Sequence, residues 1–191
     1  DKYMREYKSS AHPKGIADLI PVFCAFDKIV KTSSLRPNPL NPNKHPEEQI
    51  KLLAEIIKAA GWRTPITVSK LSGYVVKGHG RLLAATLAGL CEVPVDYQEY
   101  SSHEEETADL LADNRIAEFS KIDKKKLLDC FEQYDTGETP FLLCGFTETE
   151  YQDIASMFDE YDKKEKKEKI IKQNIVICPE CGAEFIPDEV D

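Results

Sequence analysis

Two short segments of this sequence have residue types and spacing suited to chemistry, and the first is Gly78-His79-Gly80-Arg81. The leucine- and alanine-rich stretch that follows it favours helix. A strand-to-helix turn of this kind presents backbone N–H groups and the positive end of a helix dipole. Arg81 adds a charged donor able to bind in bidentate fashion. The segment therefore predicts an anion site suited to a phosphate. A turn in which glycine serves only to bend the chain is the alternative left open.

The imidazole of His79 lies in this turn and has two interpretations. A histidine, with an ordinary pKa of about 6.5, can act as a general acid or base, or can stabilise a phosphate when protonated. His79 is therefore a candidate catalytic residue. Alternatively, it only hydrogen-bonds the backbone.

The second segment is Cys178-Pro179-Glu180-Cys181-Gly182, whose spacing is typical of a zinc knuckle. A structural Zn²⁺ site needs four ligands, so a second subunit, a partner, or His12 and Cys24 must complete the set. A homodimer would satisfy this requirement. A disulfide or a free thiol pair is the alternative. The remaining cysteines stand singly among apolar neighbours and are expected to be reduced core thiols: Cys24, Cys91, Cys130 and Cys144.

The elements expected to position the Gly78–Arg81 turn form an α+β pattern over residues 27–119. In order, we predict a strand at 29–30, a proline-rich loop at 35–43, a helix at 46–61, a hairpin at 66–76, a helix at 81–88, a strand at 93–95 and a helix from 102 to about 119. Ser102 and Glu105 have the form of a capping box for the last helix. The apolar residues of the 46–61 helix share one face, which is expected to pack on a sheet.

The remaining segments divide the chain further. Residues 1–26 are an N-terminal arm without an assigned role, 120–160 a helical extension, 161–175 a charged linker and 176–191 the cysteine knuckle. Two helices are expected in the extension, at 124–134 capped by Asp123 and at 148–158 capped by Thr147, forming a layer behind the sheet.

Charge and hydropathy limit the class of protein. The net charge of −9 argues against a nonspecific nucleic-acid binder, although Tyr161 to Lys172 carries six lysines against three acids. That basic stretch is interpreted either as a nucleic-acid contact or as a solvated linker. No apolar run is long enough to span a membrane, and the first residues do not resemble a signal peptide, so a cytoplasmic protein is expected.

The order of these motifs resembles the ParB N-terminal domain, closest to the phage and prophage variant associated with DNA methyltransferases. The matching segments are Leu35 to Asn43, Pro65 to Val68, Gly78 to Ala85, Val93 to Val95 and Asp113 to Arg115. The resemblance implies a ParB/sulfiredoxin-like fold, a small mixed sheet with packed helices.

The resemblance also implies roles for individual residues. ParB proteins hold the phosphates of a nucleoside triphosphate, such as CTP or ATP, at the position of Gly78, His79, Gly80 and Arg81. Asp113 and Asn114 lie where a Glu-Asn pair helps to hold Mg²⁺, and both offer hard oxygen ligands. Arg115 and Arg36 are candidates for secondary phosphate contacts, or are ordinary exposed charges.

This sequence also departs from the family pattern. ParB proteins usually carry Gly-Glu-Arg-Arg and a further Arg, whereas this chain has His79, Gly80 and Leu83 at three of those places. The lost charges argue against CTP clamp chemistry. Sulfiredoxins place their catalytic cysteine where this chain has His79, which excludes sulfinic-acid repair. No basic recognition helix follows the domain, so sequence-specific DNA binding is not expected.

The sequence thus predicts a phage-derived nucleotide-binding module that acts in DNA modification or maintenance. Slow hydrolysis of the nucleotide is compatible with this prediction. A metal-dependent nuclease or a small-substrate kinase on the same turn is one alternative, although few convergent carboxylates are present. A non-catalytic adaptor for a DNA methyltransferase is another.

Overall fold

The computed structural model describes residues 11–134, 144–147, 149–157, 176–177 and 184–185. The chain forms two compact units, one comprising Asp1–Ile122 and Tyr134–Phe146, the other Asp123–Gln133 and Thr147–Asp191. Within the described ranges, none of the helices is both long and apolar enough to cross a membrane.

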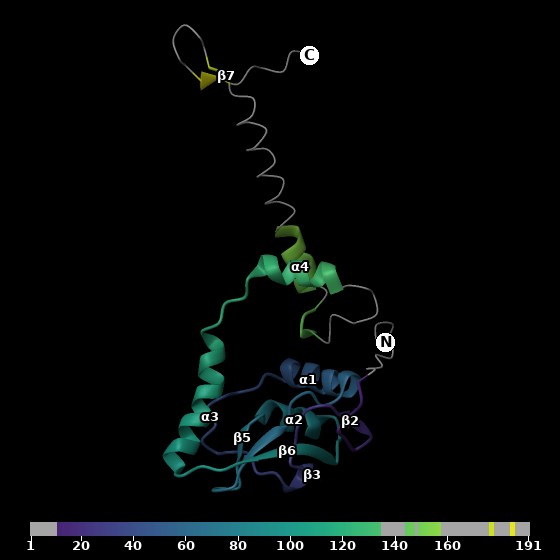
Figure 1. Ribbon diagram of the computed structural model, residues 1–191, viewed down its shortest axis with the longest axis vertical. Coiled ribbons are helices and arrows are strands. Elements are labelled where there is room, and N and C mark those ends of the chain that lie inside the picture. The colour runs from purple at the N-terminus through teal and green to yellow at the C-terminus, as the bar shows by residue number, and fades with distance from the viewer. Residues whose placement is uncertain (1–10, 135–143, 148, 158–175, 178–183, 186–191) are drawn as a thin grey trace. The chain divides into compact units, whose positions relative to one another are not determined.

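A four-stranded mixed sheet lies at the centre of the first unit (Figure 1). Its strands run in the order β3 (Lys28–Lys31), β6 (Glu92–Gln98), β4 (Ile66–Ser69) and β5 (Val75–Lys77). Strand β6 pairs antiparallel with β3 and parallel with β4, while β4 and β5 form the predicted antiparallel hairpin. The sequence-predicted order of strand, helix, hairpin, helix and strand is confirmed.

Two helices stack on one side of this sheet: α1 (Glu47–Ala60), which begins after Pro46, and α2 (His79–Leu87) (Figure 1). Helix α1 buries Ala54 and Ile57, but this apolar face packs chiefly against α2, and α2 in turn contacts β4. Ala54 and Ile57 belong to the same hydrophobic core as the sheet residues Ile66 and Val95, so α1 turns its apolar face toward the core that covers the sheet, as its periodicity predicts.

The N-terminal part of the first unit contributes to its core. Strands β1 (Gly15–Ala17) and β2 (Ile20–Val22) form a hairpin, and Val22 bridges to Trp62 after α1. The side chains of Ala17, Val22 and Trp62 are fully buried. Residues 15–22, which lie in the segment predicted to be an N-terminal arm, are thus part of the packed unit. A short 3-10 turn, η1 (Thr32–Ser34), follows β3.

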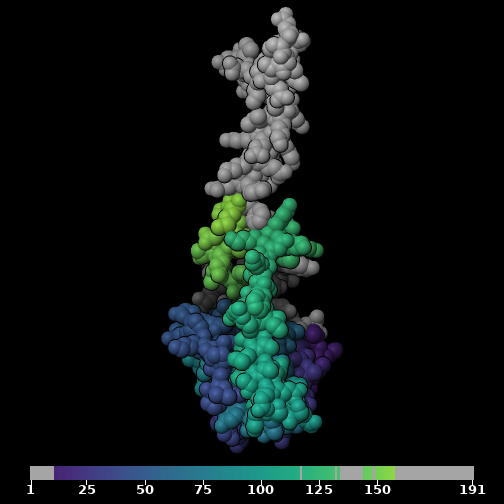
Figure 2. All heavy atoms as spheres, turned by 90° about the vertical axis from the view of Figure 1, so that its left-hand side faces the viewer, coloured from purple at the N-terminus to yellow at the C-terminus, as the bar shows by residue number. Residues whose placement is uncertain are grey.

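Helix α3 (His103–Glu118) lies along β5 and covers one face of the first unit. Figure 2 looks onto α3, with the segment around α1 on one side and the N-terminal hairpin on the other. The predicted cap is present, because the Oγ atom of Ser102 accepts a hydrogen bond of 3.3 Å from the backbone N–H of Glu105. The Glu105 carboxylate accepts a hydrogen bond from the backbone N–H of Ser101, whereas in a standard capping box it would accept one from Ser102.

The second unit contains the two predicted helices of the extension. Helix α4 (Lys124–Tyr134) is capped by Asp123. Its Oδ1 atom accepts hydrogen bonds from the backbone N–H groups of Lys125 and Lys126. Residues 149–157 are helical, and Thr147 and Glu150 form a reciprocal capping box. The two helices meet at Phe131 and Tyr151, whose rings pack edge to face at 5.5 Å.

The C-terminal segment is described only at β7 (Val176–Ile177) and β8 (Glu184–Phe185), which pair antiparallel. The charged linker and the Cys178–Cys181 pair lie outside the described residues. Zinc binding at this pair stays a prediction.

The other four cysteines are free thiols, and the expectation that they are core residues is wrong for three of them. Cys24 is half-buried, whereas Cys91, Cys130 and Cys144 are exposed. Cys130 illustrates the reason. Its neighbour Phe131 is buried in α4, but successive residues of a helix point to different faces, so apolar neighbours in sequence do not imply burial.

Candidate anion site

The connection between β5 and α2 has the geometry of an anion-binding turn. Gly78 has the left-handed conformation, φ 90° and ψ 29°, and α2 begins at the next residue without a side-chain cap. A β-carbon at Gly78 would lie 2.9 Å from Nη2 of Arg81. Glycine is therefore needed here twice, once for the backbone conformation and once for the close approach of the Arg81 guanidinium.

Arg81 folds its guanidinium back over Gly78 at the start of α2. Its Nε atom is buried and has no hydrogen-bond partner within the part of the chain that the structure describes. Burial lowers the pKa of Arg81, while the charges of Asp113 and Cys24 act in the opposite direction. The guanidinium remains charged, because arginine does not lose its proton in proteins. The turn thus combines the positive end of a helix with a buried cationic donor that lacks a partner.

His79 is buried in the same turn and accepts a hydrogen bond of 3.2 Å from the backbone N–H of Asn38 at its Nε2 atom. Because Nε2 is the acceptor, the neutral ring carries its proton on Nδ1. Burial first, and then the nearby His45, lower the pKa of His79. Of the two interpretations drawn from sequence, this geometry favours the backbone hydrogen bond. The histidine joins the turn to the proline-rich loop.

The proline-rich loop is held by local hydrogen bonds. Asn38 Oδ1 accepts a bond of 2.9 Å from the N–H of Leu40, and Asn41 Oδ1 accepts one of 3.2 Å from the N–H of Asn43. Such Asx turns stiffen a loop that contains several prolines. His45 follows this loop, and Pro46 separates it from the first residue of α1.

Sequence reasoning missed His45, which lies against Gly80. A β-carbon at Gly80 would be 3.2 Å from Cε1 of His45 and 3.2 Å from Cδ1 of Leu53. The Nδ1 atom of His45 lies 3.0 Å from Oε1 of Gln49. His45 and Gly80 are far apart in sequence and share no motif, so only the packing of α1 on α2 reveals the contact.

The predicted residues of α3 have different positions. Asp113 is exposed, yet close enough to the turn for its charge to act on Arg81. Asn114 donates its side-chain amide to the carbonyl of Leu110 in its own helix at 3.1 Å. Arg115 forms an ion pair with Glu118 and lies 4.4 Å from the ring centre of Phe119. The charge of Asp113 therefore acts on Arg81, whereas Arg115 is paired within its own helix.

Asp113 and Asn114 fit a magnesium ion only as minor ligands. No cluster of three or more His, Cys, Asp or Glu side chains that could hold a metal occurs among the described residues. Mg²⁺ usually takes one or two protein carboxylates and completes its shell with phosphate oxygens and water. Asp113, with the Oδ1 atom of Asn114, suits this type of site.

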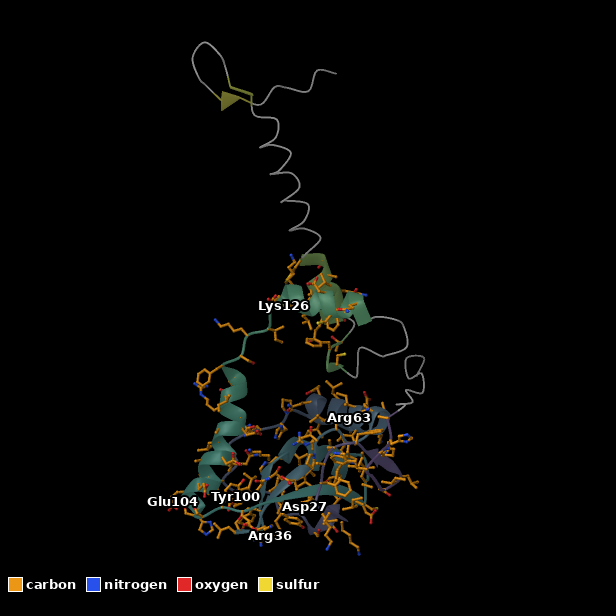
Figure 3. All side chains as sticks on the ribbon, in the orientation of Figure 1. Asp27, Arg36, Arg63, Tyr100, Glu104 and Lys126 are labelled. Atoms are coloured by element: carbon orange, nitrogen blue, oxygen red, sulfur yellow. The ribbon has the colours of Figure 1, made fainter. Side chains whose placement is uncertain are left out.

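Arg36 is not brought to the turn. It donates a hydrogen bond of 2.8 Å to the hydroxyl of Tyr74 and lies 4.4 Å from the centre of that ring. Tyr74 precedes β5, whereas the anion turn follows it. Figure 3 shows Arg36 at the lower edge of the unit, well away from Arg63 after α1.

A second polar cluster, which we call the Glu106 cluster, joins α3 to the β4–β5 turn. It consists of Glu106, Ser69 and Ser72. The Glu106 side chain is only 4% exposed and accepts hydrogen bonds from both serine hydroxyls at 2.7 Å. The same hydroxyls accept bonds from backbone N–H groups of the turn, so the turn is held from both sides.

Farther along the same interface, Asp109 forms an ion pair of 2.9 Å with Lys77 and accepts a hydrogen bond of 2.8 Å from the hydroxyl of Tyr100. Burial would raise the pKa of Asp109, but the bonds from Lys77 and Tyr100 outweigh it and lower that pKa overall. Burial and the bond to Asp109 raise the pKa of Tyr100. Tyr100 and Glu104 lie at the same end of α3 (Figure 3). These contacts fix α3 on β5.

A surface hollow of about 630 Å³ lies at the other end of α2 and is lined by Thr86, Leu90 and Cys91, among others. None of the site residues predicted from sequence lines it. The anion turn is therefore not part of this hollow.

Comparison with known proteins identifies the domain. A family model described as the ParB N-terminal domain matches residues 25–114, a range that contains the turn and ends at Asn114. The ParB-like nuclease domain-containing protein YnaK of Escherichia coli (strain K12) is 38% identical over 61 residues, covering 32% of this chain and 69% of YnaK. The chain belongs to the ParB N-terminal domain family.

Two further relatives extend the likeness beyond YnaK. The chromosome-partitioning protein Spo0J of Thermus thermophilus is 36% identical over 100 residues, but the chain spans only 37% of its length. The solved structure of C-terminally truncated ParB from Caulobacter crescentus, complexed with CTP-γ-S, matches with a TM-score of 0.51 at 21% identity, covering 63% of this chain and 71% of that chain. This likeness confirms the predicted ParB/sulfiredoxin-like α+β fold.

Proposed function

We propose that this chain is a ParB-like module that binds the phosphates of a nucleoside triphosphate on the Gly78–Arg81 turn and acts in DNA modification or maintenance. The observation that carries the proposal is the buried Nε atom of Arg81, which has no partner among the described residues. A buried donor without an acceptor costs about 1–3 kcal/mol, and more when it is charged. A phosphate oxygen at the turn would supply the acceptor.

The surroundings of Arg81 support this assignment. The first amides of a helix have no partners within the helix, and the helix dipole favours a negative charge at this end. The first turn of α2 contains no acidic residue that would compete for these groups. Asp113 acts on Arg81 through its charge, which suits a Mg²⁺ ion shared with the phosphates. Such an ion would neutralise phosphate charge, and Asp113 and Asn114 would help to hold it.

The hydrogen bonding and burial of His79 favour a binding role for the site over a catalytic one. Its Nε2 atom is already engaged by Asn38, and burial disfavours its charged form. A catalytic role would require that bond to break. Slow hydrolysis of the nucleotide does not depend on His79 and stays compatible with the proposal. A nuclease that uses metal ions needs several convergent carboxylates, a requirement that the described residues do not meet.

The setting in the cell is inferred from the relatives. Spo0J and ParB are named for chromosome partitioning, which supports a role in DNA maintenance. The resemblance to phage proteins associated with DNA methyltransferases supports the narrower role of an accessory to DNA modification. A pure adaptor for such an enzyme is the competing proposal, and it predicts no nucleotide binding.

The test is a thermal-shift screen of the purified chain against CTP, ATP, ADP, GTP and UTP, each with and without Mg²⁺. A ligand that binds only the folded state raises the melting temperature by mass action. We expect a magnesium-dependent rise for one nucleotide, with CTP the first to test because ParB of Caulobacter crescentus was solved with CTP-γ-S. A flat screen would contradict nucleotide binding and favour the adaptor.

A further inference from the structure

His45 lies beside the anion turn without belonging to the turn's sequence motif. The Cε1–Nδ1 edge of its ring faces the position that a Gly80 side chain would take, at 3.2 and 3.3 Å from the expected β-carbon. Any side chain at residue 80 would push the ring away. The absence of a side chain at Gly80 therefore lets the imidazole approach the first turn of α2.

The hydrogen bonding of His45 leaves one ring nitrogen available. Nδ1 donates to Oε1 of Gln49 at 3.0 Å, because an amide oxygen can only accept. Nε2 has no hydrogen-bond partner among the described residues. With Nδ1 fixed as the donor, the ring binds an anion through Nε2 only when Nε2 also carries a proton.

Titratable and charged groups lie around His45 on α2, on α1 and in its own loop. On α2 the titratable neighbour is His79, whose pKa is lowered by burial and by the charge of His45. On α1 and in its own loop, the charged neighbours in sequence are Glu47, Glu48 and Lys44. A phosphate bound beside Arg81 would add the negative charge that stabilises an imidazolium.

We propose that His45 is a second phosphate contact of the site, a residue that takes up one proton from solvent when the phosphate binds. The protonated Nε2 then donates its N–H to a phosphate oxygen across Gly80, beside Arg81. The inference rests on the proposed function and adds to it a linkage between nucleotide binding and protonation. Binding is accordingly tighter at lower pH.

The experiment is calorimetric titration of the full chain with inorganic triphosphate and Mg²⁺ at pH 7.5, in two buffers with different heats of ionisation. The phosphates are common to every candidate nucleotide, so the probe removes the base as a variable. The variant is His45→Gln, and the matched control is His103→Gln, an exposed histidine at the start of α3. The difference in apparent heat between the buffers reports the number of protons taken up.

We expect His45→Gln to bind roughly 5- to 30-fold more weakly, as the loss of one charged hydrogen bond implies. Its proton uptake should fall below that of the wild type by up to one proton, whereas His103→Gln should match the wild type in both measurements. The titration of the triphosphate itself is common to all three proteins and cancels in this comparison.

Gly80→Ala gives a second, independent measurement. In the wild type the added methyl group displaces the ring and weakens binding. In the His45→Gln background the same change should weaken binding less, because the contact is already lost, and the two effects should be less than additive.

The outcomes separate this inference from the proposed function. Equal affinity and equal proton uptake in wild type and His45→Gln, with binding abolished by Arg81→Ala, would overturn the role of His45 and leave the site intact. Failure of the wild type to bind either triphosphate or any of the five nucleotides would overturn both.

Discussion

The two ends of β5 carry polar clusters of opposite character. At the end near the β4–β5 turn, the Glu106 cluster is buried and Glu106 accepts a hydroxyl at each of its two oxygens. At the other end, the anion turn holds the buried Nε atom of Arg81 with no partner in the described chain. Buried polar groups in folded proteins are nearly always hydrogen-bonded, so the first cluster is what folding alone produces. Among the described residues Trp62 Nε1 is also buried without a partner, but it lies in the hydrophobic core, whereas the charged Arg81 lies at the start of α2, where an anion would supply the missing acceptor.

This contrast assigns stability to one cluster and binding to the other. Replacing a residue of the Glu106 cluster should affect folding and leave ligand affinity unchanged. Replacing Arg81 should do the reverse.

The largest effect on stability is expected for Glu106→Ala. The change removes two hydrogen bonds to a charged acceptor and leaves two serine hydroxyls in a buried site, so the free energy of unfolding should fall by about 2–4 kcal/mol. Urea denaturation measures it, with Glu55→Ala, an exposed residue of α1, as a control expected to stay within about 0.5 kcal/mol. A loss below about 1 kcal/mol would remove the Glu106 cluster from the stability account.

Arg81→Met should not lower the free energy of unfolding, in contrast to Glu106→Ala. The methionine keeps much of the buried aliphatic volume and removes a buried cation with an unmet donor. The free energy of unfolding of the ligand-free protein should therefore stay the same or rise by about 1–2 kcal/mol. A fall of more than about 1 kcal/mol would mean that Arg81 is a structural residue whose partner has been missed.

Tyr100→Phe should destabilise the protein by about 1 kcal/mol. The hydroxyl that is lost donates to Asp109 in a partly buried site, next to the Lys77–Asp109 ion pair. Urea denaturation checks the size of the effect, and nucleotide affinity should not change. Altered affinity in this variant would show that the α3–β5 interface and the anion turn are coupled.

The smallest effect concerns the protonation of His79. Its pKa is lowered in the folded state by burial, so the stabilising contribution is complete above the ordinary pKa of about 6.5 and is lost as the pH falls below it. The free energy of unfolding should decline between pH 7 and pH 5, by at most about 1.4 kcal/mol per pH unit for this one proton. In His79→Gln that part of the slope should disappear, whereas His103→Gln should keep it. An identical slope in both variants would exclude His79 as its source.

The regular elements and their caps could be predicted because their signals are local. Thr147 with Glu150, Asp123 before α4, and Pro46 before α1 lie within a few residues of the groups that they position. The β4–β5 hairpin and the turn at Gly78 likewise combine alternating apolar residues with glycine. Such patterns need no information from the rest of the chain.

The β1–β2 hairpin was missed because its turn lacks the usual residues. Asp18 and Leu19 both have positive φ, 48° and 67°, where glycine or asparagine is common. A contact distant in sequence holds this turn, since Asp18 accepts a hydrogen bond of 2.7 Å from the N–H of Cys91. Sequence patterns do not reveal such a bond.

Within the candidate site, sequence patterns named the turn and Asp113 as candidates but did not reveal the packing around the turn. The bond from Asn38 to His79 and the contact of His45 with Gly80 depend on how the proline-rich loop and α1 pack against α2. The positions of Arg36 and Arg115 show the same limit. Both are arginines near the matched motifs, and both are held by nearby aromatic rings rather than at the turn.

Whether Arg81 binds the phosphates can be measured by calorimetric titration of wild type, Arg81→Ala and Arg63→Ala with CTP and Mg²⁺. Arg63 is an exposed arginine that stacks on Phe23 and bonds to the end of α1, so it controls for loss of one positive charge. Should the thermal-shift screen single out another nucleotide, that nucleotide replaces CTP. We predict that Arg63→Ala binds like the wild type and that Arg81→Ala binds at least about 10-fold more weakly while remaining folded. Equal affinity in all three proteins would contradict the claim.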